Sequence, residues 1–197
     1  MRKLLPFLLM LLALPASADP ALGRRGRPTY TASTGAAACD AANVLAVEST
    51  ATTGIKILRW CVNMSQATAA AAVNITLVRT TAASSGGTAL TAEGTGTTAV
   101  SKMDPADANY GGVARGGAAT ITAGARLDQA GFSIGEIGAG TADPASPNNF
   151  CKTYGSGTAE KLPTAALGVA NGIALTMSAS GAGSLSSCAM SVTFIAE

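Results

Sequence analysis

Histidine is absent from this 197-residue chain. General acid–base catalysis commonly uses a side chain whose pKa lies near neutrality, and His is the usual one. Ser-His-Asp and Cys-His nucleophilic sites are therefore excluded. A pair of carboxylates is the arrangement that remains, and Asp104 and Asp107, which flank Pro105, are the best-spaced pair. Aspartates at such spacing more often accept hydrogen bonds from backbone amides in a turn. Glu136 lies among glycines and has no acidic neighbour in the sequence.

Charged and aromatic residues are also scarce, at 12% and 4% of the chain. Without Arg2 and Lys3 of the leader described below, the chain has eleven basic and eleven acidic residues, so its formal net charge is zero. A near-neutral surface argues against nucleic acid as a partner, because binding to phosphates requires a basic surface. Low charge also permits self-association or docking onto a larger assembly. With so few aromatics, the core must be built from Val, Ile, Leu and Met.

The first 18 residues have the pattern of a secretory signal peptide. Arg2 and Lys3 precede the apolar run Leu4–Leu14, and the small residues Ala16–Ala18 follow. The run is shorter than the ~20 residues of a membrane-spanning helix. We therefore expect cleavage before Asp19 and a secreted or extracytoplasmic protein, located in the periplasm or on a cell or virion surface, without stable membrane insertion. A single-pass anchor is the alternative, which the absence of a second membrane-length run disfavours.

Four cysteines, Cys39, Cys61, Cys151 and Cys188, form an even set in a chain expected to be exported, which predicts two disulfides. A zinc site is the alternative, but His and C-x-x-C pairs are both absent, so no metal or cofactor is predicted. Strand alternation places Cys61 on an outward face and Cys188 on an inward face, which disfavours a bond between them. Of the three pairings, we favour Cys39–Cys61 with Cys151–Cys188.

Domain boundaries follow from composition. Residues 19–40 are rich in Gly, Ala and Arg without periodicity and are expected to form a flexible arm, with residues 41–197 as one β-sandwich domain. The clearest strand is Gly54–Met64, in which Trp60 shares its face with other apolar residues. We interpret Trp60 as a core residue rather than a ligand-stacking one.

The C-terminal region predicts a hairpin, because Ile173–Ser178 and Met190–Ile195 both alternate and Gly181–Gly183 lies between them. Short strands, Gly-rich turns and the lack of an amphipathic helix together predict an all-β fold, a single antiparallel β-sandwich. The glycine pairs are expected at turns with positive φ; they are Gly86-Gly87, Gly111-Gly112 and Gly116-Gly117.

Two stretches resemble a known group of proteins. In Leu77–Thr91 a strand with Arg79 leads into Ser85-Gly86-Gly87-Thr88, and Lys102–Asp107 follows; Gly172–Glu197 carries two alternating segments and ends in Glu. These features are similar to small β-rich virion proteins of tailed bacteriophages and prophages. The resemblance implies a jelly-roll-like accessory or decoration protein on a capsid, neck or tail, and it brings no catalytic residues.

Three functions are consistent with these patterns. The first is a non-enzymatic structural protein, an accessory subunit of a phage virion or extracellular surface assembly, with other subunits and itself as partners. The second is a secreted pilin-like or adhesin subunit that binds a surface glycan through the loop Ala139–Asn149. Residues 19–38 lack the alternating apolar pattern of a pilin donor strand. The third is a polysaccharide hydrolase using Asp104 and Asp107, which requires two carboxylates about 5–9.5 Å apart.

Overall fold

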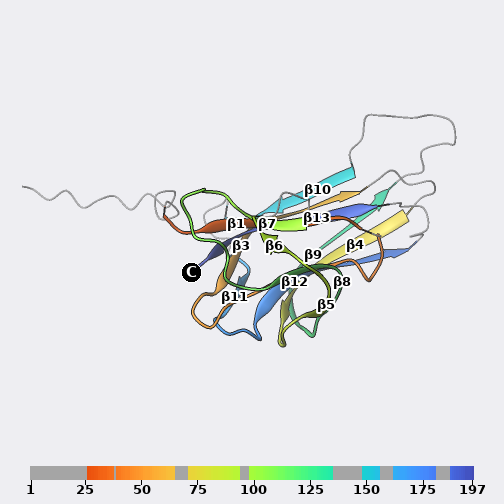
Figure 1. Ribbon diagram of the computed structural model, residues 1–197. Helices are drawn as coiled ribbons and strands as arrows, with labels where there is room; N and C mark the ends of the chain where they lie inside the picture. Colours follow the sequence, from red (N-terminus) through yellow and green to blue (C-terminus); the bar gives the residue numbers. More distant parts are fainter. Residues whose placement is uncertain are drawn as a thin grey trace, which may run out of the picture.

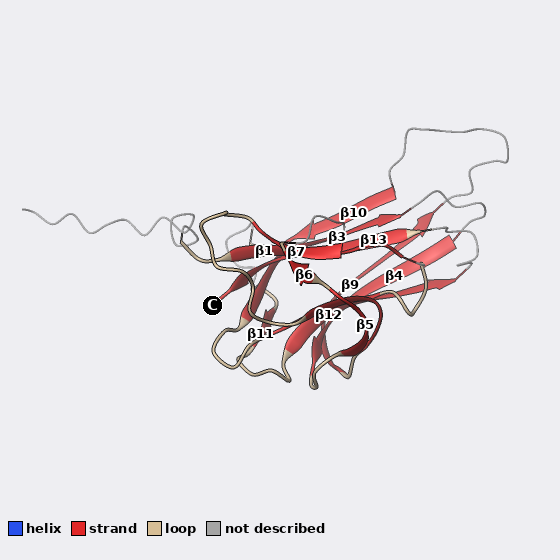
Figure 2. Ribbon diagram, viewed as in Figure 1, coloured by secondary structure: helices blue, strands red, loops and turns tan. Residues whose placement is uncertain are grey.

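The chain folds into two β-sheets packed face to face, as Figure 1 shows for the computed structural model. The structure describes residues 26–37, 39–64, 71–93, 98–134, 148–155, 162–180 and 187–197. Within these ranges the regular elements are strands (Figure 2), and no helix there is long and apolar enough to span a membrane. The expected all-β sandwich is confirmed. The expected signal peptide, residues 1–18, lies outside the described residues, as do Glu136 and most of the loop proposed for glycan binding.

Seven strands form the first sheet and six form the second. The first sheet has the order β10-β3-β13-β1-β7-β6, with β11 also paired to β3; its strands are β1 (Thr29–Ala37), β3 (Ile55–Met64), β6 (Thr91–Ala92), β7 (Thr98–Lys102), β10 (Asn148–Thr153), β11 (Thr164–Ala165) and β13 (Cys188–Ala196). The second has the order β5-β8-β2-β12-β4-β9; its strands are β2 (Val44–Glu48), β4 (Ala71–Thr80), β5 (Ser85–Ala89), β8 (Ala114–Thr120), β9 (Ala123–Ile134) and β12 (Gly172–Ser180). All pairs are antiparallel except β6 with β7.

The main strands pair from the two ends of the chain inward. β1 pairs with β13, β2 with β12, β3 with β10 and β4 with β9. Successive pairs alternate between the two sheets, so each sheet contains strands from both halves of the chain. The segment from β5 to β8 is inserted between β4 and β9 and lengthens both sheets.

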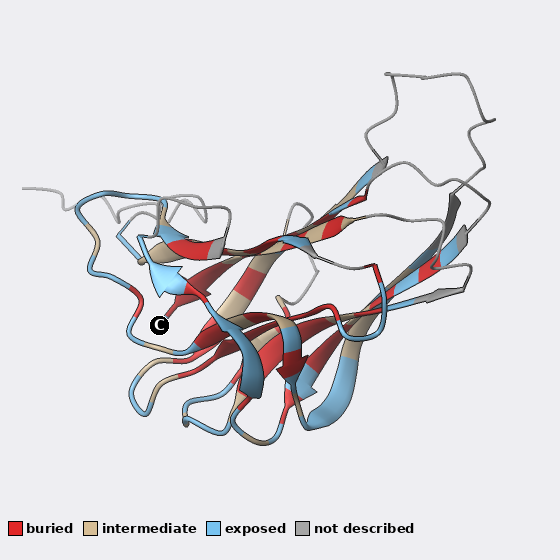
Figure 3. Cartoon of the chain, turned by 45° about the vertical axis from the view of Figure 1, so that its right-hand side comes forward, coloured by how far each residue is buried: buried red, intermediate tan, exposed pale blue. Residues whose placement is uncertain are grey.

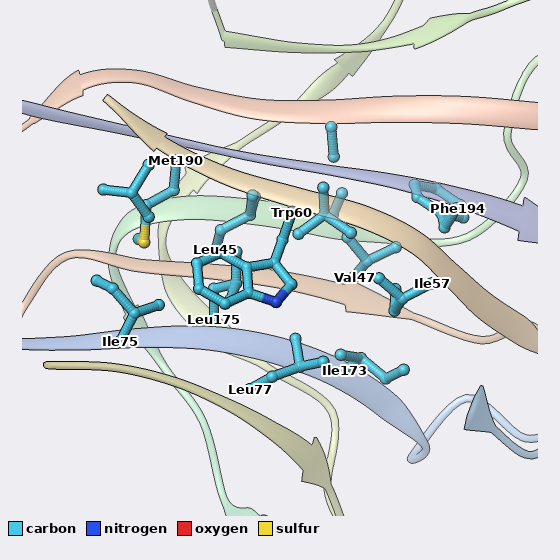
Figure 4. Packing of buried hydrophobic residues seen from close by; sticks show 14 of the residues in the cluster. Leu45, Val47, Ile57, Trp60, Ile75, Leu77, Ile173, Leu175, Met190 and Phe194 are labelled. Atoms are coloured by element: carbon cyan, nitrogen blue, oxygen red, sulfur yellow. The ribbon is translucent and has the colours of Figure 1, made fainter. Parts of the chain in front are cut away.

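Apolar side chains from the two facing surfaces form the core. Figure 3 shows buried positions on strands of both sheets. Alternation places every second residue of a strand inward, as the buried positions of β3 and β13 show. Trp60 of β3 is 1% exposed and lies among aliphatic side chains of both sheets (Figure 4), so the predicted core role of Trp60 is confirmed. The labelled residues of this core include Leu45, Leu77, Ile173 and Leu175 from the second sheet and Ile57, Met190 and Phe194 from the first.

Strand β2 is buried on both of its faces. Leu45 and Val47 belong to the main core, whereas Val44 and Ala46 belong to a second, smaller apolar cluster with Val78, Ala119 and Ala174. Ala119 lies in β8, which pairs with β5. Apolar residues on both faces give β2 a continuous apolar sequence, unlike the alternating pattern of a strand with one face in water.

The expected flexible arm is wrong for residues 29–37, which form β1 in the interior of the first sheet between β13 and β7. Tyr30, Ala32 and Thr34 of this strand are buried. Every second residue of β1 therefore points into the core. Ala32 is too small and Thr34 too polar to produce the alternating hydrophobic pattern that predicts a strand. The sandwich begins at Thr29 rather than at residue 41.

The predicted C-terminal hairpin is also wrong, although both of its strands exist. β12 lies in the second sheet between β2 and β4, and β13 lies in the first sheet between β1 and β3. Gly181–Gly183, the predicted turn, lies outside the described residues. Alternation determines which face of a strand is buried but not which strand lies beside it, so it does not show that two consecutive strands belong to different sheets.

The glycine pairs have two different roles. Gly86 and Gly87 have φ values of 64° and 59° at an irregularity in β5, and Gly117 has a φ of 69° in β8, as expected for positive-φ positions. Gly111, Gly112 and Gly116 do not have positive φ, so the expectation is wrong for them. At Gly112 the reason for glycine is space, because a Cβ would lie 2.5 Å from the Glu48 carbonyl oxygen.

Candidate functional site

Two disulfides join the four cysteines, as predicted, but with a different pairing from the favoured one. The bonds are Cys39–Cys188 and Cys61–Cys151. Cys61 and Cys151 lie directly opposite each other on the adjacent strands β3 and β10, whereas Cys39 and Cys188 are both buried. The argument from strand faces correctly separates Cys61 from Cys188, but it contains no information on the neighbours of Cys39 and Cys151. Two disulfides are typical of an oxidising, extracytoplasmic compartment.

Asp104 and Asp107 belong to a turn after β7. The Asp104 carboxylate accepts a hydrogen bond from the Ala106 amide (2.9 Å), and the Asp107 amide donates to the Asp104 carbonyl (3.0 Å). These are the backbone hydrogen bonds expected of turn aspartates. No group of three or more His, Cys, Asp or Glu side chains that could hold a metal ion is found in the described ranges.

A polar network that the sequence did not reveal joins the two sheets. The Trp60 indole N–H donates to the Tyr154 hydroxyl (2.9 Å), and that hydroxyl donates to Asp128 of β9. Lys152 of β10 forms an ion pair with the same carboxylate (2.8 Å) and lies over the Tyr154 ring. β9 and β10 are edge strands of different sheets. The network therefore connects the two sheets at this side of the sandwich.

The charge of Asp128 follows from these contacts. Burial by itself would raise the pKa of Asp128, but hydrogen bonds from Lys152, Tyr154 and the Gln129 amide, together with the Lys152 charge, lower it below its usual value. Asp128 is therefore ionised near neutrality and accepts the hydrogen bonds of both Lys152 and Tyr154. The sequence does not predict this network, because nothing in the local sequence around Asp128, Lys152 or Tyr154 shows that β9 and β10 lie on the same side of the sandwich.

Because the pKa of Asp128 is lower in the folded state, this carboxylate contributes stability above its unfolded pKa of about 3.9. We expect that contribution to be lost as pH falls from about 4 through the folded pKa. Asp128→Asn should make the unfolding free energy less dependent on pH in that window and lower it by about 1–3 kcal/mol at neutral pH. Urea unfolding at a series of pH values measures both effects. An unchanged pH dependence in Asp128→Asn would contradict the assignment.

A second polar cluster lies around Glu48, at the end of β2. The buried carboxylate accepts hydrogen bonds from both the amide and the hydroxyl of Ser84, and the Tyr110 hydroxyl donates to the Glu48 carbonyl. Burial raises the pKa of Tyr110 well above its usual value, and the Glu48 carboxylate and Tyr30 raise it further. Tyr110 therefore remains protonated near neutrality and acts as a donor that fixes the loop before β8.

Three adjoining hollows share lining residues, because Glu197 lines the first two and Lys56 lines the second and the third. One, of about 470 Å³, lies beside Tyr30, Tyr110 and the threonines of residues 50–53. A second, of about 470 Å³, lies beside Arg27, Lys56 and Glu197. The third, of about 460 Å³, we call the basic hollow; it is lined by Lys56, Arg79, Thr80, Thr164, Ala165, Ala166, Asn171 and Gly172.

The C-terminal residue organises the wall shared by these hollows. The Glu197 carboxylate forms ion pairs with both Arg27 and Lys56. The Glu197 backbone is fixed by hydrogen bonds with Gly54, one in each direction, of 2.6 and 3.1 Å. Lys56 lines both the second hollow and the basic hollow, and its ammonium group is paired with Glu197.

Two positively charged side chains, Lys56 and Arg79, line the basic hollow, and a hydrogen bond fixes the position of the Arg79 guanidinium. The Arg79 Nε donates to the Thr164 carbonyl (2.7 Å), which holds the guanidinium at the end of β4 against β11. Lys56 comes from β3, Gly172 is the first residue of β12, and Asn171 precedes it. The sequence could not indicate this site, because its residues come from four separate segments that only the tertiary structure brings together. Comparison of the chain with protein-family models, with curated proteins and with solved structures finds no match.

Proposed function

We propose that this protein is a non-enzymatic structural subunit that joins an extracellular assembly, as an accessory or decoration protein on a phage virion or another surface. It is exported after removal of residues 1–18 and associates with neighbouring subunits, including further copies of itself. The observation that carries this proposal is the edge strand β9. The two disulfides and the Asp128 network support it, because they give a rigid body that can occupy a fixed position.

Strand β9 has 12 residues and pairs with β4 along one side. Among the strands that the structure describes, none pairs with its other side. The free edge of a strand presents unpaired N–H and C=O groups, and these can pair with a strand of another chain. A long edge strand is therefore a natural place for a neighbouring subunit to attach.

The two parts of β9 differ in how strongly they discourage pairing with a strand of another chain. At Leu127 the register with β4 shifts, and Asp128 points toward the first sheet; an irregularity and an inward charge both discourage edge pairing. From Gln129 to Ile134 the register with β4 is regular, and this segment contains no charge and no proline. We therefore propose that a neighbouring strand adds along residues 129–134.

A jelly-roll arrangement is also proposed. Its support is the nested pairing of eight strands, first with last and second with second-last, in the two four-stranded groups β10-β3-β13-β1 and β2-β12-β4-β9. Jelly rolls consist of eight strands in two sheets and occur in viral capsid proteins and lectins. This step from fold to virion is an analogy at the level of the fold, because one fold serves many functions.

The test is hydrogen exchange on the free and self-associated protein, prepared at low and high concentration. We expect amides of residues 129–134 to gain protection on association, while those of β2, already interior, remain unchanged. Gln129→Lys places a charge at the exposed edge and should weaken association about tenfold or more. Ser178→Lys is the matched control, because Ser178 is an exposed residue of the interior strand β12.

Two results would contradict the proposal. A protein that stays monomeric at millimolar concentration and does not co-purify with particles would count against an assembly role altogether. Association with protection elsewhere, and equal effects of Gln129→Lys and Ser178→Lys, would retain the assembly role but rule out β9 as the attachment site. Sedimentation of each variant across a concentration series separates these two cases.

A further inference from the structure

The two disulfides differ in how far solvent reaches them. Cys39 and Cys188 are 3% and 1% exposed, so the bond between them is closed off in the core. Cys61 and Cys151 are both partly exposed, on the outer face of the first sheet. A disulfide is cleaved by direct attack of a thiolate on one of its sulfur atoms, so access helps to decide which bond reacts. Of the two bonds, Cys61–Cys151 is the one open to thiols in solution.

Arg59 lies beside this bond on the same face of the sheet. It comes two residues before Cys61 in β3 and lies opposite Thr153 of β10, so it is a diagonal neighbour of Cys151 across the strand pair. A terminal nitrogen of its guanidinium donates to the Cys151 sulfur at 3.0 Å. Within the described part of the chain, no carboxylate forms an ion pair with Arg59. The positive charge next to the Cys151 sulfur is therefore not neutralised by an acidic side chain there.

The position of Arg59 makes the two sulfur atoms unequal. When a disulfide is cleaved, one sulfur is attacked and the other leaves as a thiolate, and a better stabilised thiolate leaves faster. An arginine next to a cysteine stabilises the thiolate form. Because Arg59 contacts Cys151, Cys151 is the favoured leaving group and Cys61 is the favoured point of attack. The Asn149 Oδ1 lies 3.3 Å from the Cys151 sulfur and can accept a hydrogen bond from it once that sulfur carries a proton.

The surroundings of Cys61 suit a small thiol with negative charge. A thiolate attacks in line with the S–S bond, from the side of Cys61 opposite Cys151. On that side the neighbour of Cys61 across the sheet is Ser191 of β13, a small and partly exposed residue. Arg59 is exposed on the same face and attracts anions to it. Size and charge therefore both favour a small anionic thiol over a bulky or cationic one.

We propose that Cys61–Cys151 is a site of thiol–disulfide exchange with anionic low-molecular-weight thiols of the glutathione class. The incoming thiolate attacks the Cys61 sulfur and forms a mixed disulfide there. The Cys61–Cys151 bond breaks, and its electron pair leaves with Cys151 as a thiolate beside Arg59. A second thiolate can then attack the mixed disulfide, which joins the two small thiols to each other and leaves both cysteines reduced. Cys39–Cys188 stays intact throughout.

Exchange at this site acts on the edge of the first sheet. Among the described strands β10 pairs with β3 alone, and this disulfide is its covalent link to β3. β10 also carries Lys152, the partner of Asp128 in the network that joins the two sheets. Cleavage should therefore speed amide exchange in residues 148–153, while β1 and β13 keep their protection. The site lies on a different strand from the attachment segment 129–134, so it stands or fails independently of the assembly role.

Treatment of the folded, disulfide-bonded protein with reduced glutathione at neutral pH tests the proposal. Acid quenching, alkylation and peptide mapping then identify which cysteines have reacted. We expect Cys61–Cys151 to open at least about tenfold faster than Cys39–Cys188, and the first mixed disulfide to form on Cys61. Equal rates for the two bonds, first attack on Cys151, or cleavage that occurs only in urea would each overturn the proposal.

Arg59→Gln separates the role of the charge from that of exposure alone. Arg59 is an exposed residue, so the variant should fold with an unchanged melting temperature. Cleavage of Cys61–Cys151 by neutral mercaptoethanol should slow about threefold, because the leaving thiolate loses its stabilisation. Cleavage by anionic mercaptoethanesulfonate should slow about tenfold, because the attacking thiol also loses the attraction of the guanidinium.

Two further variants control for this result. Arg59→Lys keeps the positive charge and should react at close to the rate of the parent protein. Arg126→Gln makes the same change at an exposed arginine of β9 and should alter neither rate. Parent-like rates in Arg59→Gln with both thiols, or equal slowing in Arg59→Gln and Arg126→Gln, would overturn the proposal.

Discussion

Trp60→Ala is expected to lower the free energy of unfolding by about 3–5 kcal/mol, the cost of removing a large aromatic side chain from a closed core. Trp60 lies between the sheets at 1% exposure and contacts the Phe150 ring at a centroid distance of 5.2 Å. The substitution also removes the indole donor to Tyr154. Urea unfolding of the oxidised protein, followed by far-ultraviolet circular dichroism, measures the change.

Two further variants make this test specific. Trp60→Phe retains a ring in the core but loses the N–H, and it should cost about 1–3 kcal/mol, less than the alanine variant. Val169→Ala, at a residue that is 64% exposed, is the surface control and should change stability by no more than about 0.5 kcal/mol. A cost below about 1 kcal/mol for Trp60→Ala would show that Trp60 is not a core residue.

Removal of the Cys39–Cys188 disulfide by the double change Cys39→Ala and Cys188→Ala is expected to cost about 2–5 kcal/mol. This bond links residues 149 positions apart, so in the chain-entropy account it removes much of the freedom of the unfolded chain. Urea midpoints of the variant and the oxidised parent measure the loss. An unchanged midpoint would mean that the bond contributes nothing to the folded state.

The second disulfide provides a matched comparison, because Cys61–Cys151 joins the edge strand β10 to β3. Its removal should speed amide exchange in residues 148–153, whereas removal of Cys39–Cys188 should act on the whole sandwich. Non-reducing peptide mapping tests the pairing directly. A peptide linking Cys39 to Cys61 would contradict the structure and restore the pairing that the sequence favoured.

Strand positions could be predicted well where large apolar residues alternate with polar ones. This signal predicts β3, β12 and β13, and the apolar residues on the same face of β3 predict that Trp60 lies in the core. The same signal does not predict β1, because its inward positions include Ala32 and Thr34, which are buried but contribute little hydrophobicity. Backbone hydrogen bonds to the strands on its two sides can hold a strand in a sheet. Its side chains then need not show the hydrophobic pattern from which a strand is predicted.

Partners across space were much harder to predict. Cys61 and Cys188 were correctly separated by strand face, but the pairing of Cys39 with Cys188 depends on chain segments 149 residues apart. The Asp128–Lys152 pair depends in the same way on β9 and β10 meeting at one side of the sandwich. The basic hollow is a further case, since Lys56, Arg79 and Asn171 each look like ordinary surface residues in isolation.

Side-chain alternation and cysteine number are local or compositional properties, so the all-β class, the buried faces of the strongest strands and the presence of two disulfides can be predicted from the residues alone. Which strands pair, which cysteines bond, and which polar groups gather around Asp128 and in the basic hollow depend on the folded arrangement of the whole chain. Strand pairing uses backbone groups that are common to every residue. The choice of neighbour is therefore set by the packing of the whole chain rather than by any one segment.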